Sequence, residues 1–162
     1  MSIKRKEEVG APPRSVGRAV LRPMSVTDLQ QVIRIEHTSF PTPWTLELFV
    51  RELSLKFSHN FVLDLLGMVI GYINFWIVAG EMHIMSIAVH EEYRGKKVGT
   101  MLLERSLAYA QRHGAEYVHL EVRKNNDAGI ALYHGMGFEV VGVRKGYYTD
   151  TGEDALIMAR HL

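Results

Sequence analysis

Hydrophobic and polar positions repeat along this chain with two different periods, and the change of period marks out its elements. Apolar residues recur every three to four positions across Val98–Arg112, which predicts an amphipathic helix that Gly114 caps. Helical spacing also predicts helices at residues 25–36, 45–55 and 126–135. Short apolar or alternating runs predict strands at residues 19–22, 60–66, 68–78, 82–89, 117–122, 138–143 and about 155–159.

The order of these elements indicates the α/β class. Strands between residues 60 and 89 follow one another closely, as in an antiparallel meander, whereas strands and helices alternate from residue 82 to residue 143. The strands on either side of the helix Val98–Arg112 are therefore predicted to be parallel. We expect a single mixed, mostly antiparallel twisted sheet with a central parallel strand pair, flanked by helices. Ligands of such parallel pairs bind at the carboxyl ends of the strands.

Composition narrows the classes of protein to consider. The 162 residues are 47% hydrophobic and 23% charged, which fits one globular domain, expected at residues 18–162 behind a flexible tail of residues 1–17. The tail has a basic triplet, Lys4–Lys6, that could touch RNA on a ribosome, although a solvated end is the more ordinary interpretation. In the helix at residues 45–55, one side carries Leu46, Phe49, Val50 and Leu53.

Several kinds of chemistry are excluded or disfavoured. The chain has no cysteine, so it has no disulfide, no cysteine-ligated zinc and no cysteine acyl-enzyme. The net charge of +1 does not favour direct nucleic-acid binding. No apolar run approaches the roughly 20 residues that span a bilayer, and no signal peptide is evident. Eight histidines without metal-ligand spacing predict no metal site. Because neither a membrane span nor a signal peptide is predicted, we expect a cytoplasmic enzyme or binding module.

The turn from Arg94 to Thr100 is the first candidate for a binding site. It joins an apolar strand to the helix that begins at Val98, where unpaired backbone N–H groups and the helix dipole favour an anion such as pyrophosphate. Gly95 and Gly99 allow close approach of the backbone, and two lysines add positive charge. A glycine-bearing turn between a strand and a helix is equally common as a simple connection that binds no ligand.

This turn resembles the R/Q-x-x-G-x-G/A signature of the GNAT superfamily of acyl-CoA acyltransferases. Lys97 departs from the signature, because it stands where the superfamily usually has its first glycine. The backbone N–H of Lys97 can still point at phosphate, provided that φ is negative at this residue. The resemblance implies the GNAT fold and acetyl-CoA as cosubstrate. The residues that it implies for binding acetyl-CoA are Ile87, Ala88, Val89, Arg94, Gly95, Lys96, Lys97, Val98, Gly99, Thr100, Asn126 and Tyr133.

A second block, from Leu120 to Phe138, is similar to the L-E-V-R-x-x-N-x-x-A-I-x-L-Y-x-x-x-G-F block of RimI-like and Ard1-like N-terminal protein acetyltransferases, a branch of GNAT. Gly129 replaces its alanine. The resemblance implies that Glu121 is the general base and that Tyr133 protonates the leaving thiolate. From the residues alone, a surface glutamate and a core tyrosine are the alternatives.

Two further residues near the predicted cofactor site have a structural alternative. Asn126 is well placed to cap the helix that follows it, and the resemblance adds a hydrogen bond to pantetheine. His83 falls where some Ard1-like enzymes carry a residue that assists the base, although a half-buried strand histidine is the more ordinary interpretation. We therefore expect His83 to have a secondary part in catalysis.

The acceptor is indicated by two aromatic segments. Tyr147–Tyr148 matches a loop that grips the peptide backbone in RimI-like and Ard1-like enzymes, and Phe40–Pro41 matches the opposite wall of that slot. The resemblance thus implies transfer to a protein N-terminal α-amine by direct attack in a ternary complex, with an N–H near Val89 facing the oxyanion. The alternatives are acetylation of a small amine or a lysine side chain, and a non-catalytic acyl-CoA-binding subunit. Ribosome association is possible; membrane contact is not expected.

Overall fold

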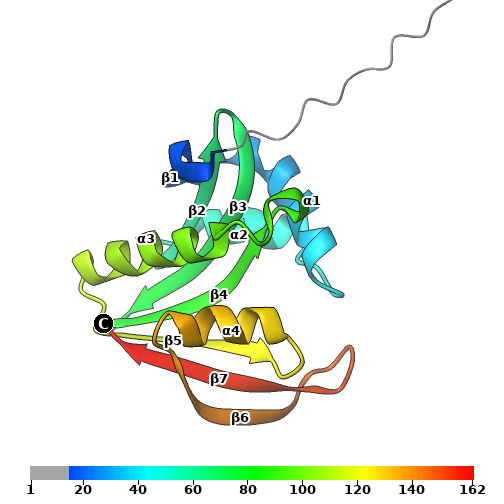
Figure 1. The fold of residues 1–162 in the computed structure, drawn as a ribbon, viewed down its shortest axis with the longest axis vertical. Coiled ribbons are helices and arrows are strands. Elements are labelled where there is room, and N and C mark those ends of the chain that lie inside the picture. The colour runs from blue at the N-terminus through cyan, green and yellow to red at the C-terminus, as the bar shows by residue number, and fades with distance from the viewer. Residues whose placement is uncertain (1–14) are drawn as a thin grey trace, which may run out of the picture.

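The computed structural model describes residues 15–162 and contains a seven-stranded sheet with helices on both faces (Figure 1). The strands are β1 (Val20–Pro23), β2 (Ser58–Leu65), β3 (Met68–Val78), β4 (Glu81–Val89), β5 (Tyr117–Arg123), β6 (Glu139–Tyr148) and β7 (Glu153–His161). The α-helices are α1 (Leu29–Ser39), α2 (Leu46–Ser54), α3 (Val98–Arg112) and α4 (Asp127–Gly135). Short 3₁₀ helices are η1 (Val16–Arg18), η2 (Val26–Asp28) and η3 (Glu91–Tyr93).

The strand order is β1-β2-β3-β4-β5-β7-β6, and β4–β5 is the parallel pair that the sequence predicts. All other neighbouring strands are antiparallel. Short turns connect β2 to β3, β3 to β4 and β6 to β7. Figure 1 shows β4 and β5 beginning side by side and separating toward their carboxyl ends. The predicted fold class is therefore confirmed, and the parting of the two strands is its most consequential detail.

Each face of the sheet has its own hydrophobic core. On one face, α3 and α4 cover a cluster that includes Phe75, Leu102 and Leu120. On the other face, α1 and α2 cover a smaller cluster built around Phe49 and Tyr72. Gly71 allows α3 to approach β3 closely, since a Cβ there would lie 2.8 Å from a Leu102 methyl group. The sheet thus separates two layers of helices.

The start of α1 is fixed to the sheet by a charged network. Arg22 on β1 bonds Asp28 at 2.8 Å and Asp64 on β2 at 2.9 Å, and the Asp28 carboxylate also accepts from the Ser25 backbone at 2.8 Å. The hydrogen bonds from Arg22 lower the pKa of Asp28 to about 2. This network locks η2, and hence the direction in which α1 leaves the sheet.

Some expectations from the sequence need correction. Leu46 and Val50 do not join the core with Phe49; they lie 49% and 45% exposed, and Glu52 is buried instead. The strand predicted at residues 138–143 continues to Tyr148, because β7 pairs with it far beyond the apolar run. Most of the predicted tail lies outside the described residues, as does Lys4–Lys6, but Val16 already packs against the core. Within residues 15–162 no helix is long and apolar enough to cross a membrane.

Candidate active site

The cleft of the candidate site opens where β4 and β5 part. Their parallel pairing runs from Glu81–Tyr117 to Ile84–Leu120 and then stops. At the same level the register of β4 on β3 shifts, since Ile84 faces Phe75 and Ser86 faces Asn74, so that Met85 is an extra residue. Such a bulge bends a strand and re-aims its side chains. A cleft of about 550 Å³ lies at this point, lined from both faces of the sheet.

The bulge also changes which face each β4 side chain occupies. Met82 and Ile84 pack with the α3–α4 cluster, whereas Ala88, after the bulge, packs with the α1–α2 cluster. His83, which alternates with Met82 and Ile84, therefore points to the α1–α2 face. On β5, Val118, Leu120 and Val122 are buried in the α3–α4 cluster, so Glu121 points to the same face as His83.

His83 forms a hydrogen bond with Glu121, and Glu121 lines the cleft. The two residues are 38 apart in sequence, but the parallel register brings His83 Nε2 to 2.7 Å from Glu121 Oε2. This bond lowers the pKa of Glu121, although burial opposes the shift. The carboxylate is thus ionised and oriented by the imidazole, as a proton acceptor must be. His83 is also a half-buried strand residue, as its ordinary interpretation expects, and its contact with Glu121 is compatible with the secondary part in catalysis that we expect.

His119 extends this pair into a small cluster. Its ring stacks on that of His83 with centroids 4.2 Å apart, and burial lowers its pKa. His83, His119 and Glu121 place ligand atoms within 4.8 Å of one another, a grouping that sequence spacing did not indicate. Because His83 Nε2 and Glu121 Oε2 are hydrogen-bonded to each other, an ion would have to displace this contact. The arrangement fits a proton acceptor better than a metal site.

Tyr133 reaches the cleft from the opposite face of the sheet. It lies on α4, packs against Phe138 in the α3–α4 cluster and is only 7% exposed. Burial raises the pKa of its hydroxyl, which therefore keeps its proton and can donate it. The core-packing alternative is thus partly right, since Tyr133 packs in the core while its side chain also lines the cleft.

The turn before α3 has the shape of an anion site, with one correction. Gly95 has φ +74° and Lys97 has φ +62°. The expectation that the Lys97 N–H faces phosphate required a negative φ at Lys97, and that requirement is wrong. Lys97 adopts the left-handed conformation that a glycine would adopt without strain. Arg94 braces the turn, donating to the Val89 carbonyl at 3.1 Å and to Ser39 Oγ at 3.0 Å.

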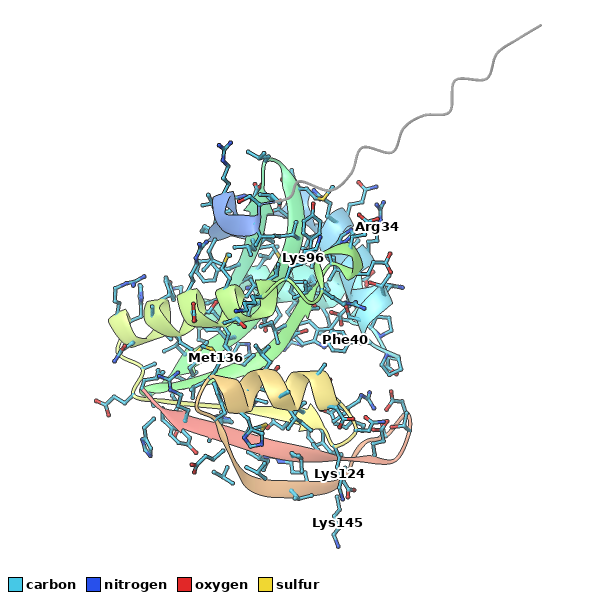
Figure 2. All side chains as sticks on the ribbon, viewed as in Figure 1. Arg34, Phe40, Lys96, Lys124, Met136 and Lys145 are labelled. Atoms are coloured by element: carbon cyan, nitrogen blue, oxygen red, sulfur yellow. The ribbon has the colours of Figure 1, made fainter. Side chains whose placement is uncertain are left out.

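The other residues expected to bind acetyl-CoA near this turn differ in their contacts and in their exposure to solvent. A Cβ on Gly99 would lie 3.3 Å from Leu132 of α4, so this glycine lets α3 and α4 approach each other. Lys96 extends over the ring of Tyr93 at 5.4 Å, and Figure 2 shows it on the turn above α3. Of the remaining predicted residues, Val98 and Ala88 are buried, while Ile87, Val89 and Thr100 are half-buried.

Asn126 caps α4, as the sequence predicts. Its side-chain oxygen accepts from the Gly129 N–H at 3.0 Å. A Cβ at Gly129 would lie 2.7 Å from the Asn126 amide nitrogen, so the glycine that departs from the family block makes room for this cap. Asn126 also lines the cleft, so capping and contact with a ligand are both open to it.

Two walls enclose the cleft on the α1–α2 face. Phe40 and Pro41 come from the segment after α1, which Figure 2 shows on the side toward α4, and Tyr147 and Tyr148 come from the end of β6. The predicted pairs are thus brought to one cleft. Tyr148 stacks under the Arg123 guanidinium at 3.9 Å, and its own pKa is raised to about 12 by burial.

A hydrogen-bonded bridge joins the two walls, which sequence reasoning missed. Thr42 Oγ1 donates to Asp150 Oδ2 at 2.7 Å, and Asp150 is paired with Arg123 at 2.9 Å. The only sequence feature that pointed to this bridge was Arg123. It belongs to the block from Leu120 to Phe138, but no contact was predicted for it. Glu36 also lines the cleft. The sequence predicted only that this residue belongs to the helix at residues 25–36.

Comparison with known proteins agrees with this geometry. The Acetyltransferase (GNAT) family model matches residues 29–138. An N-alpha-acetyltransferase of Saccharolobus solfataricus is 39% identical over 88% of this chain and 92% of its own. The crystal structure of the ribosomal-protein-S18-alanine N-acetyltransferase from Escherichia coli superposes with a TM-score of 0.81 at 32% identity, covering 88% and 93% of the two chains.

A third relative shows that the likeness extends over the whole fold. Ard1 from Thermoplasma volcanium has a TM-score of 0.82 at 28% identity, with 90% of this chain and 98% of that chain covered. The chain belongs to the GNAT family of acetyltransferases, enzymes that use acetyl-CoA.

Proposed function

We propose that this protein transfers the acetyl group of acetyl-CoA to the N-terminal α-amine of a protein. The observation that carries the proposal is the division of the cleft between the two faces of the sheet. The His83–Glu121 pair lies on the face of α1 and α2, and Tyr133 comes from the face of α3 and α4. An amine and a thioester can therefore approach the same gap between β4 and β5 from opposite sides.

The residues around α3 fit acetyl-CoA. The helix has 15 residues and begins after a turn with two positive-φ positions, so its first N–H groups can face the pyrophosphate. Lys96 and Lys97 are exposed beside them and supply positive charge. The edge of β4 beyond Ile84 has no strand partner on the β5 side, so its backbone can pair with the pantetheine amides.

The chemistry follows from the positions of three side chains. Glu121, oriented by His83, removes a proton from the acceptor nitrogen, directly or through water. The nitrogen attacks the thioester carbonyl, and a backbone N–H near Val89 stabilises the oxyanion. Tyr133 then protonates the departing sulfur. Because the chain has no cysteine, a cysteine acyl-enzyme is excluded, which leaves direct attack as the simplest route.

The walls of the cleft favour a chain end as acceptor. Thr42 and Asp150 both line the cleft and bridge its two walls, which narrows the route open to an acceptor. Tyr147 and Tyr148 offer aromatic surface and hydroxyl groups to an extended peptide. Because relatives are named for the α-amine and for ribosomal protein S18, a ribosomal protein is one candidate acceptor.

Mass spectrometry after incubation with acetyl-CoA and a library of N-terminal peptides tests this proposal. We expect acetylated α-amines and unmodified lysine side chains, and we expect Glu121→Gln to lower kcat by about 100-fold while CoA still binds. Acetylation only of lysines or small amines would replace the proposed acceptor. Absence of any product, with CoA bound, would favour the non-catalytic acyl-CoA-binding subunit.

A further inference from the structure

A second carboxyl group lies in the wall of the cleft, opposite Glu121. Glu36 on α1 is only 1% exposed, yet it lines the same cleft as Glu121 and Tyr133. One carboxylate oxygen accepts from the Trp44 backbone N–H at 2.9 Å. The other accepts from the hydroxyl of Tyr72, a fully buried residue of β3. A carboxyl group is rarely buried this deeply, because burying a charged or polar group costs free energy, so its position needs an explanation.

Tyr72 connects this carboxyl group to the cleft through Ser86. The Tyr72 hydroxyl lies 3.0 Å from Ser86 Oγ, and because Tyr72 donates to Glu36, Ser86 is the donor in this second bond. Ser86 follows the bulge in β4 and lines the cleft. Its oxygen lone pairs can therefore accept a hydrogen bond from a group bound there. A continuous chain of hydroxyl groups thus runs from the cleft to Glu36.

The reaction has a use for a second proton acceptor. An α-ammonium group carries three N–H bonds and the amide product carries one, so two protons leave the nitrogen. One equivalent ends on the CoA sulfur and the other in solvent. The first proton must leave before the nitrogen can attack, and the second leaves when the tetrahedral intermediate forms its amide. If Glu121 removed the proton that frees the nitrogen for attack, as in the simplest route described above, it would have to act a second time within the same turnover.

We propose that Ser86, Tyr72 and Glu36 form a proton path that removes the first proton from the acceptor's α-ammonium group, leaving Glu121 to remove the second. This inference rests on the proposed function. The ammonium gives a proton to Ser86 Oγ, Ser86 gives its own to Tyr72, and Tyr72 gives its own to Glu36. Both hydroxyl groups end unchanged, and Glu36 ends as a carboxylic acid. After product leaves, the proton returns along the same path to water in the open cleft.

The two carboxyl groups are matched to the two protons. Burial raises the pKa of Glu36 to about 7, close to the value of about 8 for a free α-amine. The pKa of Glu121 is lowered by His83, which suits the more acidic N–H of the intermediate. Tyr72 is the titratable group in contact with Glu36, and Glu36 forms no ion pair among residues 15–162. The other titratable or charged groups that line the cleft are Glu121, Arg123, Tyr133, Tyr147, Tyr148 and Asp150.

The pH dependence of kcat/KM for an N-terminal peptide tests the path. In the wild type the acid limb should follow Glu36, near pH 7. In Glu36→Gln only peptide that is already deprotonated can react, so the limb should move up by about one pH unit, toward the α-amine pKa. The loss should be about fivefold at pH 7, where half of Glu36 is ionised but only about a tenth of the peptide is deprotonated, and less than about twofold at pH 9. Tyr72→Phe leaves the carboxyl group in place but cuts the path, so it should shift the limb in the same way.

Controls separate this path from a merely structural role of Glu36. Tyr109→Phe removes a hydroxyl that bonds His59 away from the cleft, so its pH profile should match the wild type. An equal loss at every pH in Glu36→Gln and Tyr72→Phe, or no loss in either, would overturn the proton path. If instead the wild type acetylates no peptide α-amine at any pH, the proposed function fails first.

Discussion

Lys97 offers a direct test of how the turn before α3 is built. Its φ of +62° and ψ of +22° put an exposed L-residue in the left-handed region. That conformation costs about 1–2 kcal/mol, and glycine avoids the cost. Glycine also makes the unfolded chain more flexible, which offsets about 0.4–1 kcal/mol of the gain. Lys97→Gly should therefore stabilise the fold by about 0.5–1 kcal/mol and raise Tm by about 1–4 °C.

Lys97→Ala is the matched comparison, because it removes the same charge and keeps the strained backbone. Its stability should stay within about 0.5 kcal/mol of the wild type. Both variants lose one positive charge near the start of α3, which is worth about 0.3–1 kcal/mol for an anion, so CoA affinity should fall by less than about fivefold in each. Urea unfolding measures the stabilities and calorimetry measures CoA binding.

The reasoning fails if the glycine variant is no more stable than the alanine variant. In that case the lysine backbone is not strained by its left-handed conformation. A loss of CoA affinity beyond about tenfold in both variants would show instead that the Lys97 side chain grips the phosphates directly, rather than adding to a general positive field.

Four other substitutions probe three separate parts of the molecule. Tyr133→Phe should lower kcat by about 100-fold with CoA affinity retained, and an unchanged rate would limit the residue to packing. Asp150→Ala removes the bridge to Thr42, so KM for a peptide should rise several-fold with little change in kcat; Thr42→Ala should show part of this effect, and a fall in kcat alone would contradict it. Asp28→Asn should cost about 1–2 kcal/mol at pH 7, since the Asp28 pKa is lowered to about 2 by Arg22. That contribution is present above the unfolded-state pKa of 3.8 and is lost as the pH falls through 2, so the difference from the wild type in unfolding free energy should shrink below about pH 5 and be nearly absent only below pH 2.

The elements that the sequence predicts best are those whose local pattern and tertiary surroundings agree. The α3 helix has the predicted bounds, Val98–Arg112, because its apolar stripe is regular and Gly114 ends it with φ +87°. The parallel β4–β5 pair followed from the strand–helix–strand order. β6 was predicted too short, because the half of it that carries Arg144 and Lys145 has no apolar alternation and is held only by pairing with β7.

Recognition of a shared block, together with strand alternation, was enough to name Glu121, Tyr133 and the tyrosine pair. The contacts between those residues were not available from the chain itself. His83 meets Glu121 because of a register between strands that are separated by a whole helix. Thr42 meets Asp150 across 108 residues, and no local pattern encodes such a pair.

The chain by itself determined the periods, the caps and the residue types, because these depend on neighbours a few positions away. Tertiary structure decided where β4 and β5 part, which side of the sheet Ser86 occupies after the bulge, and how deeply Glu36 is buried. It also decided the backbone of Lys97, whose side chain favours the opposite sign of φ. These features arise from packing between distant segments, and packing energy outweighs local preference wherever the two disagree.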